Sequence, residues 1–214
     1  MGKNKKDKNS KIVYLFFKRV FDIIFGMIGL LILIPLSIII KVIFLCNGDT
    51  GRIFYSQKRI GKDGKTIKIL KYRSMVQNAE ELLAEILKEE KYREEWEYHQ
   101  KIEDDPRITP IGNILRKTSL DELPQMLNVL AGDMSIVGPR PLVEGELEMH
   151  GGSRLYWEAK PGITGWWASH GRSDIRYKER LEMEYYYIEN CSLKLDAICI
   201  YKTIMAVLKR QGAK

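Results

Sequence analysis

The hydrophobic pattern of the chain is dominated by one long apolar run near its beginning. Residues 23–40 read IIFGMIGLLILIPLSIII. As a straight helix this run would extend about 27 Å, close to the thickness of the hydrocarbon core of a bilayer. Composition alone therefore favours a transmembrane helix. The run is long for a signal peptide, and no cleavage site with small residues follows it.

Two features of this segment argue against a simple span. Pro35 lies inside the run, where it removes a backbone donor and predicts a sharp kink. Basic residues also flank both ends, and the positive-inside rule draws both flanks to the cytoplasm. These residues are Lys3, Lys5, Lys6, Lys8, Lys11, Lys18 and Arg19 before the run, and Lys41, Arg52, Lys58 and Arg59 after it. A re-entrant helix that enters the membrane, breaks at Pro35 and returns satisfies both constraints. Arg19 and Asp22 at its mouth would pair with each other, contact headgroups or act as ordinary interfacial anchors.

The pattern after the apolar run predicts a hairpin followed by helices. Residues 52–75 alternate apolar and polar around Gly61-Lys62-Asp63-Gly64, as expected of a β-hairpin. Residues 77–103 are rich in glutamate and lysine and carry leucine and isoleucine at helical spacing, which predicts one charged amphipathic helix.

Residues 111–131 predict two short helices, and residues 150–175 are rich in glycine and aromatic residues and favour loops. Residues 193–208 carry apolar side chains at helical period, which suits a helix that faces the core or lies in the interface. We therefore predict an α+β fold that is mostly helical. Its parts are a flexible basic tail over residues 1–11, the membrane segment over residues 12–46, and a small domain over residues 47–214.

Composition and charge narrow the class of partner. The chain has 214 residues and a formal net charge of +7, a balance that favours anionic partners such as lipid headgroups, nucleotides or nucleic acid. Its basic residues are spread along the chain and match no nucleic-acid motif, so we expect no nucleic acid. A membrane-tethered basic binding module is the alternative from another class of function.

The three cysteines indicate the redox compartment. Cys46, Cys191 and Cys199 lack metal-ligand spacing and indicate reduced thiols in a cytoplasmic protein.

The strongest candidate for chemistry is the acidic pair Asp121-Glu122. It lies between a basic segment and the turn Gly138-Pro139-Arg140-Pro141, and two adjacent carboxylates beside basic residues could hold a divalent metal and a polyphosphate together. Two structural explanations compete with this one. Asp121 as a helix N-cap would place Pro124 at the third helical position, where no backbone donor is needed. Ser119 and Glu122 as a capping box would place Pro124 where one is needed.

Lys71 and Arg73 would leave the second strand of the hairpin on the same face. They would bind phosphate there, or they would form a solvated strand face, and the pattern does not decide between the two.

Several blocks of sequence resemble one family. SLDELPQMLNVLAGDMSIVGPRP, followed by KPGITGW and GR, resembles the bacterial sugar transferases known as monotopic phosphoglycosyl transferases, and KYRSM and DPRIT add to the likeness. The resemblance extends from about Phe17 to Gly212. It implies a re-entrant membrane helix and a cytoplasmic catalytic domain at the bacterial inner membrane. It also implies transfer of a sugar 1-phosphate from a UDP-sugar to undecaprenyl phosphate with release of UMP.

The resemblance also assigns roles to residues. Asp121 would be the nucleophile that forms a covalent phosphosugar intermediate, and Glu122 would hold Mg²⁺. Arg140 would grip a phosphate, with Arg116 as the second choice, unless both are interfacial anchors. Arg172 and Arg107 are weaker candidates for contact with the nucleotide or for structural pairing.

The chain also departs from the family pattern. Members commonly continue after PGITGW with A-Q-V-N-G-R, whereas this chain has Trp167-Ala168-Ser169-His170-Gly171-Arg172. The break in the membrane helix is often Ser-Pro and is here Ile34-Pro35. A phosphatase with an aspartyl-phosphate intermediate is a third reading. The sequence does not identify the sugar, which would be a hexose or an N-acetylated sugar. It also leaves open whether the glycan is a capsule, an exopolysaccharide or a protein-linked oligosaccharide, and whether the protein forms a homodimer.

Overall fold

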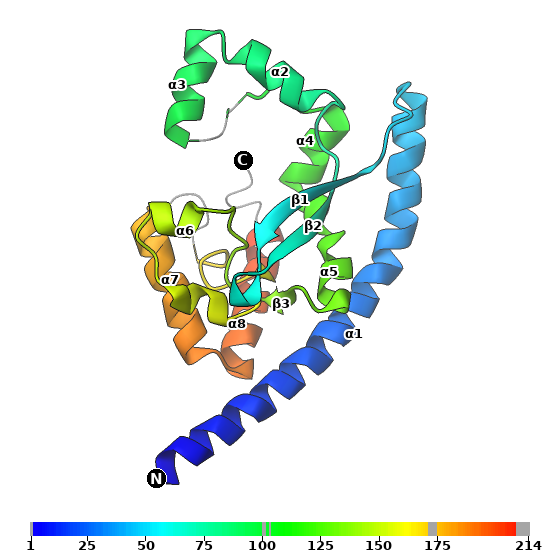
Figure 1. The fold of residues 1–214 in the computed structure, drawn as a ribbon. Coiled ribbons are helices and arrows are strands. Elements are labelled where there is room, and N and C mark those ends of the chain that lie inside the picture. Colours follow the sequence, from blue (N-terminus) through cyan, green and yellow to red (C-terminus); the bar gives the residue numbers. More distant parts are fainter. Residues whose placement is uncertain (1, 100–101, 103, 171–174, 209–214) are drawn as a thin grey trace.

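The computed structural model describes residues 2–99, 102, 104–170 and 175–208, and these residues form a mostly helical fold with two small two-stranded sheets (Figure 1). The predicted α+β class with a majority of helix is therefore confirmed. The α-helices in chain order are α1 (Gly2–Cys46), α2 (Ala79–Ile86), α3 (Glu90–His99), α4 (Pro110–Lys117), α5 (Gln125–Ala131), α6 (Glu146–Met149), α7 (Tyr177–Asn190) and α8 (Leu193–Leu208). The strands are β1 (Phe54–Ile60), β2 (Thr66–Tyr72), β3 (Ser135–Val137) and β4 (Gly162–Thr164).

Helix α1 contains the whole apolar run and is continuous past Pro35. The predicted break is thus not confirmed, although the axis of α1 changes direction partway along the helix in Figure 1. The helix also begins at Gly2, within the segment that we predicted as a tail. Residues 10–46 form the one described helix that is long and apolar enough to cross a membrane. Leu31 is 72% exposed and Phe16 65%, which leaves an apolar surface to face lipid.

One stripe of α1 is buried against the rest of the protein. Asp22, Gly26, Gly29 and Leu33 recur at helical period on this stripe. A Cβ at Gly26 would lie 2.7 Å from Leu130 of α5, so the absence of a side chain lets the two helices approach closely.

Two charged residues dock α1 onto the domain. The Arg19 guanidinium donates hydrogen bonds to the carbonyl oxygens of Val129 (2.6 Å) and Leu130 (2.8 Å), near the C-terminal end of α5. A cation is favoured there because the last carbonyls of a helix lack backbone donors. Asp22 accepts hydrogen bonds from the hydroxyl of Ser135 (2.9 Å) and the backbone N–H of Ile136 (2.8 Å). Both residues thus contact the domain, a role that we did not anticipate.

The hairpin is confirmed, whereas the single helix over residues 77–103 is wrong. Strands β1 and β2 pair in an antiparallel register that places Phe54 opposite Tyr72. The predicted helix is instead divided into α2 and α3, with a turn after Leu87. Its apolar stripe ends at Leu87, and the Lys-Glu-Glu-Lys sequence of residues 88–91 offers nothing to continue it.

The two short helices that bracket the acidic pair are confirmed as α4 and α5, and the last predicted helix is confirmed as α8. Helix α7 was not predicted. It packs with α8 and β3 in a buried cluster that includes Val137, Tyr187 and Leu195. The loop-rich segment 150–170 also contributes β4, which pairs in parallel with β3. All three cysteines are free thiols.

Candidate active site

The acidic pair lies in a short 3-10 turn, residues Leu120–Glu122, between α4 and α5. Ser119 before it has φ of 56°, a left-handed conformation that is uncommon for residues other than glycine. Helix α5 begins at Gln125, its cap residue is Pro124, and no side chain caps it. Both capping interpretations of the pair are therefore wrong, and the two carboxylates are free of a structural role in capping α5.

The two carboxyl groups have different electrostatic surroundings. Lys71 Nζ lies 2.8 Å from Glu122 Oε1. Burial raises the pKa of Asp121, the neighbouring Glu122 raises it further, and Lys71 and Arg116 oppose the shift. Glu122 is thus compensated by a direct ion pair, whereas Asp121 is a partly buried carboxylate at close quarters with another. Such environments separate the roles of paired carboxylates.

Arg116 reaches the same region from α4. Its Nε donates to Ser74 Oγ at 2.9 Å, just after β2. Burial lowers the pKa of Arg116, and the Asp121 carboxylate opposes that shift. A Cβ at Gly112 would lie 1.9 Å from the carbonyl oxygen of Ser74, so only glycine lets α4 come this close to the end of the strand. Lys71 and Arg116 are therefore placed with the acidic pair.

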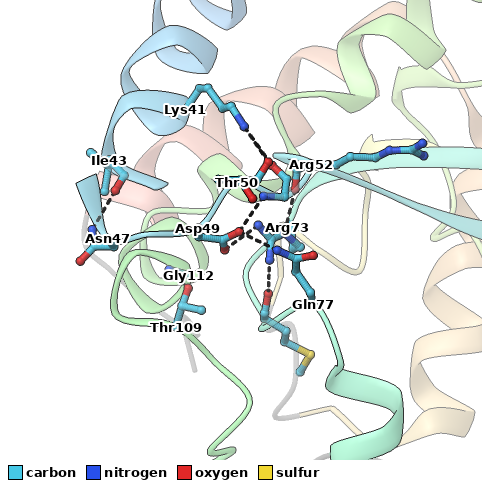
Figure 2. Close-up of polar contacts among 12 residues, drawn as sticks. Lys41, Ile43, Asn47, Asp49, Thr50, Arg52, Arg73, Gln77, Thr109 and Gly112 are labelled. Atoms are coloured by element: carbon cyan, nitrogen blue, oxygen red, sulfur yellow. Dashed lines mark hydrogen bonds and ion pairs between the residues drawn. The ribbon is translucent and has the colours of Figure 1, made fainter. Parts of the chain in front are cut away.

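Arg73 belongs to a network that joins the end of α1 to the hairpin (Figure 2). Its guanidinium contacts Asp49 at 2.7 Å, donates to the carbonyl oxygen of Arg52 at 2.7 Å, and lies 4.7 Å from the ring centre of Phe44. Gln77 also donates to Asp49, at 2.9 Å. Arg73 is thus engaged in structural contacts.

Arg107 is likewise engaged. Its side chain is buried, makes hydrogen bonds of 2.8 and 2.6 Å to Asp105, and lies 5.7 Å from the ring centre of Trp96. Of the two roles that we considered for Arg107, the structure shows the structural pairing.

Arg140 belongs to a second cluster, built on Trp167. The Arg140 guanidinium lies 5.6 Å from the Trp167 ring and that of Arg180 lies 4.8 Å from it. The backbone N–H of Arg140 donates to Glu184 Oε1 at 3.0 Å, and its carbonyl oxygen accepts from the hydroxyl of Tyr156 at 2.9 Å. The Gly-Pro-Arg-Pro turn is therefore held by its backbone, which leaves the exposed guanidinium available to an anion.

This second cluster contains buried polar atoms that lack hydrogen-bond partners among the described residues. They are Arg59 Nε, Trp167 Nε1, Arg180 Nε and Nη2, and Glu184 Oε2. Glu146 lies 3.5 Å from Arg180 and 4.0 Å from Arg59, so it balances part of their charge. Buried polar groups are ordinarily satisfied, so such a set indicates a place that a ligand or water completes.

Sequence reasoning missed Arg59, Arg180 and Glu184. Burial raises the pKa of Glu184 to about 7, while the Arg140 N–H and the two neighbouring guanidinium groups oppose the shift. The spacing of Arg180 and Glu184, four residues apart on α7, is the signal that would have placed them on one face of a helix.

The residues that depart from the family pattern are partly described. Arg172 lies outside the described residues. His170 packs against Trp166, with Nδ1 2.7 Å from the Trp166 carbonyl oxygen and Nε2 2.5 Å from Lys202 Nζ. His170 and Trp167 thus contribute to different contacts, because Trp167 stacks with the arginines.

Among the described residues, no group of three or more histidine, cysteine, aspartate or glutamate side chains is arranged to hold a metal. The acidic pair nevertheless fits Mg²⁺, which proteins often bind through one or two carboxylates together with substrate phosphates and waters. The two carboxyl groups are adjacent and Glu122 raises the pKa of Asp121 in addition to burial, so a cation beside the pair would relieve their mutual repulsion.

A long helix with an exposed apolar surface, packed into a small domain that carries an acidic pair and clustered arginines, indicates a membrane-associated protein. The family model described as bacterial sugar transferase matches residues 13–210. The chain therefore belongs to the bacterial sugar transferase family.

Three relatives illustrate the likeness. The exopolysaccharide production protein ExoY of Sinorhizobium fredii is 43% identical over 198 residues, which cover 92% of this chain and 87% of the relative. The UDP-galactose-lipid carrier transferase of Erwinia amylovora is 46% identical over 200 residues, covering 92% of this chain and 42% of the relative. The undecaprenyl-phosphate galactose phosphotransferase of Salmonella typhimurium is 44% identical, with the same coverage. The chain thus spans less than half of the latter two proteins.

Proposed function

We propose that this protein transfers a sugar 1-phosphate from a UDP-sugar to undecaprenyl phosphate at the cytoplasmic face of the bacterial inner membrane. The product would begin the assembly of a glycan such as an exopolysaccharide or a capsule. The observation that carries the proposal is the difference between the surroundings of the two carboxyl groups. Lys71 balances the charge of Glu122 in an ion pair, while Asp121 is partly buried beside it. The names of the relatives support the two substrates.

The reaction proceeds in two displacements on the β-phosphorus of the donor. A carboxylate oxygen of Asp121 attacks that phosphorus, the bond to the bridging oxygen breaks, and UMP leaves with the electron pair. A phosphate oxygen of undecaprenyl phosphate then attacks the aspartyl phosphosugar. The bond between phosphorus and the Asp121 oxygen breaks, which regenerates the carboxylate and gives the polyprenyl diphosphate sugar. A covalent relay suits this chemistry because two anionic phosphates would otherwise have to meet directly.

The residues around the pair have distinct tasks in this proposal. Glu122, with Asp121, would hold Mg²⁺, which when bound neutralises charge on the diphosphate. Lys71 fixes the orientation of Glu122, and Arg116 supplies positive charge near Asp121. Arg140 would hold a phosphate of the donor through its planar guanidinium.

The cluster around Trp167 would complete the nucleotide-sugar site. Its unsatisfied N–H groups on Arg59, Arg180 and Trp167 are donors, and Glu184 Oε2 is an acceptor. Such a combination suits the phosphate oxygens and hydroxyl groups of a nucleotide sugar.

We also propose that both ends of α1 lie on the cytoplasmic side, with Pro35 at its deepest point. Basic residues on both flanks and the exposed apolar surface between them support this topology. Side-specific labelling of cysteines placed at the two termini would test it, because labels that react from opposite sides would contradict the re-entrant arrangement.

The activity is tested by incubating purified protein with Mg²⁺, undecaprenyl phosphate and a panel of UDP-sugars that includes galactose, glucose and N-acetylated hexoses. UMP release is compared among the wild type, Asp121→Ala and the control Asp133→Asn, whose carboxyl group is exposed after α5. We expect release that needs undecaprenyl phosphate for turnover and disappears only in Asp121→Ala. Release that persists in Asp121→Ala would contradict the nucleophile, and steady release without the lipid would favour hydrolysis.

A further inference from the structure

Two hydroxyl groups hold α1 next to Pro35. Ser37 Oγ donates to the carbonyl oxygen of Leu33 at 2.7 Å, and the hydroxyl of Tyr72 donates to the same oxygen at 3.2 Å. The two hydroxyl oxygens are 2.7 Å apart. Pro35 lacks the N–H that would bond to the carbonyl of Leu31, whereas the regular helical partner of the Leu33 carbonyl is the N–H of Ser37. The two hydroxyl groups therefore add donors beside the proline rather than replace the donor that it lacks. Tyr72 is only 2% exposed, and these contacts are therefore shielded from water.

Tyr72 also belongs to the strand that serves the acidic pair. It follows Lys71, whose side chain contacts Glu122. The ring of Tyr72 lies in the same hydrophobic cluster as Leu33, and Leu120 and Leu123, on either side of the acidic pair, pack against that cluster. The position of Tyr72 thus affects both the membrane helix and the turn that carries Asp121.

The two halves of α1 are attached to the domain by separate contacts. Before Pro35, Arg19 and Asp22 join the helix to α5 and to the start of β3. After Pro35, Ser37 joins it to Tyr72 of β2. Buried Ile40 and Phe44, the latter against the Arg73 guanidinium, also hold α1 after Pro35. Loss of the Ser37–Tyr72 contact would therefore loosen the helix beside the proline without detaching either half.

We propose that Ser37 and Tyr72 are positioning residues that fix the C-terminal half of α1 relative to the Asp121-Glu122 turn, and thereby the height of that turn above the membrane. The inference rests on the proposed function for its substrate. A lipid-linked phosphate is confined to the membrane surface, whereas a nucleotide sugar arrives from water. A change in the height of the turn therefore weakens the encounter with the lipid and leaves the reaction with the nucleotide sugar unchanged.

The test compares Ser37→Ala, Tyr72→Phe and the double variant in lipid nanodiscs. The controls are Ser56→Ala and Tyr201→Phe, which remove hydroxyl groups from exposed residues. Three quantities are measured: formation of the covalent adduct from UDP-sugar alone, the KM for undecaprenyl phosphate, and quenching by spin-labelled lipid of a fluorophore on Cys46. Cys46 is exposed at the end of α1, and a Cys191→Ser background leaves the buried Cys199 as the one other thiol.

We expect each single variant to raise the KM for undecaprenyl phosphate by about threefold to tenfold, the effect of one lost hydrogen bond. The double variant should exceed the larger single effect by little, because the two hydroxyls act as one unit. Adduct formation should stay at the wild-type level, and Cys46 quenching should change in all three variants.

Additive effects, a parallel loss of adduct formation, or unchanged quenching would each overturn the inference. A wild type that forms no adduct would refute the proposed function instead. The quenching measurement would then decide the inference alone, because it needs no activity: a change would support the attachment by Ser37 and Tyr72, and no change would overturn it.

Discussion

Lys71 Nζ and Glu122 Oε1 lie 2.8 Å apart, and this contact links the end of the hairpin strand β2 to the acidic turn between α4 and α5. The contact orients Glu122 and leaves Asp121 as the carboxyl group whose pKa is raised by burial and by its neighbour. In the proposed mechanism, a nucleophile and a metal ligand can thus stand side by side in sequence and still act differently.

Replacing Lys71 with methionine should shift the acid limb of the pH profile of UMP release. Lys71 lowers the pKa of Asp121, so its removal should raise that pKa further and protonate the nucleophile at higher pH. We expect the acid limb to move upward and the rate at neutral pH to fall by about tenfold to hundredfold. Rates measured from pH 4.5 to 8 would check this, with Lys68→Met on the same strand as the control. An unchanged or lowered limb would contradict the electrostatic role of Lys71.

The stability of the protein should depend on the ionisation of Glu184. Its pKa is raised to about 7 by burial, from 4.5 for the unfolded chain, so the folded state binds the proton more tightly. The free energy of unfolding should therefore fall as pH rises from 4.5 to 7, by at most about 3 kcal/mol. Glu184→Gln keeps an acceptor for the Arg140 N–H and should flatten this decline. Denaturation at pH 5 and pH 7.5 measures it, and the exposed Glu182→Gln should behave as the wild type.

Arg107→Met should destabilise the fold rather than weaken binding of the nucleotide sugar. The variant leaves the buried Asp105 carboxylate without its guanidinium partner, which should cost about 3 kcal/mol. Adding Asp105→Asn should recover part of the loss, because it removes the unpaired charge. Thermal melts and the KM for UDP-sugar distinguish the two roles. A raised KM with unchanged stability would assign Arg107 to the substrate site.

Asp22→Ala should weaken the attachment of α1. It leaves the Ser135 hydroxyl and the Ile136 N–H without their acceptor, at a cost of about 1–3 kcal/mol for each buried group. Asp22→Asn should lose less, because its amide oxygen still accepts. Melting temperatures in one detergent would be compared with those of Glu182→Ala, an exposed site on α7 where alanine fits the helix. Equal melting temperatures for Asp22→Ala and the wild type would show that this contact does not stabilise the fold.

The elements that sequence predicted well are those with a clear period. The hairpin alternates apolar and polar residues, and the helices on either side of the acidic pair carry apolar residues at helical spacing. The existence and approximate bounds of these elements therefore followed from the pattern. The long glutamate-rich segment failed because its apolar stripe ends at Leu87 while its composition does not change. Helix α7 escaped because it buries charged residues, Arg180 and Glu184, which a periodic pattern assigns to the surface.

The candidate site divides in the same way. Arg116 and the acidic pair come from a segment with strong local signals, whereas the pattern left the role of Lys71 open, and the structure places all four residues together. The capping interpretations failed because the left-handed Ser119 and the start of α5 at Gln125 depend on backbone geometry that composition does not encode. Which arginines meet Trp167 is decided by packing between distant segments, so local patterns carried no information on it.

The contacts of Arg19 and Asp22 have a consequence for the modularity of this protein. The C-terminal end of α5, the first residues of β3 and the cluster around Tyr72 are all completed by side chains of α1. A fragment without residues 1–46 would expose an apolar face. It would also leave the last carbonyl groups of α5 and the donors at the start of β3 without the side chains that bind them. The membrane helix is consequently not an interchangeable anchor. Swapping it for an unrelated one, or trimming it to obtain a soluble enzyme, would remove part of the interior of the protein.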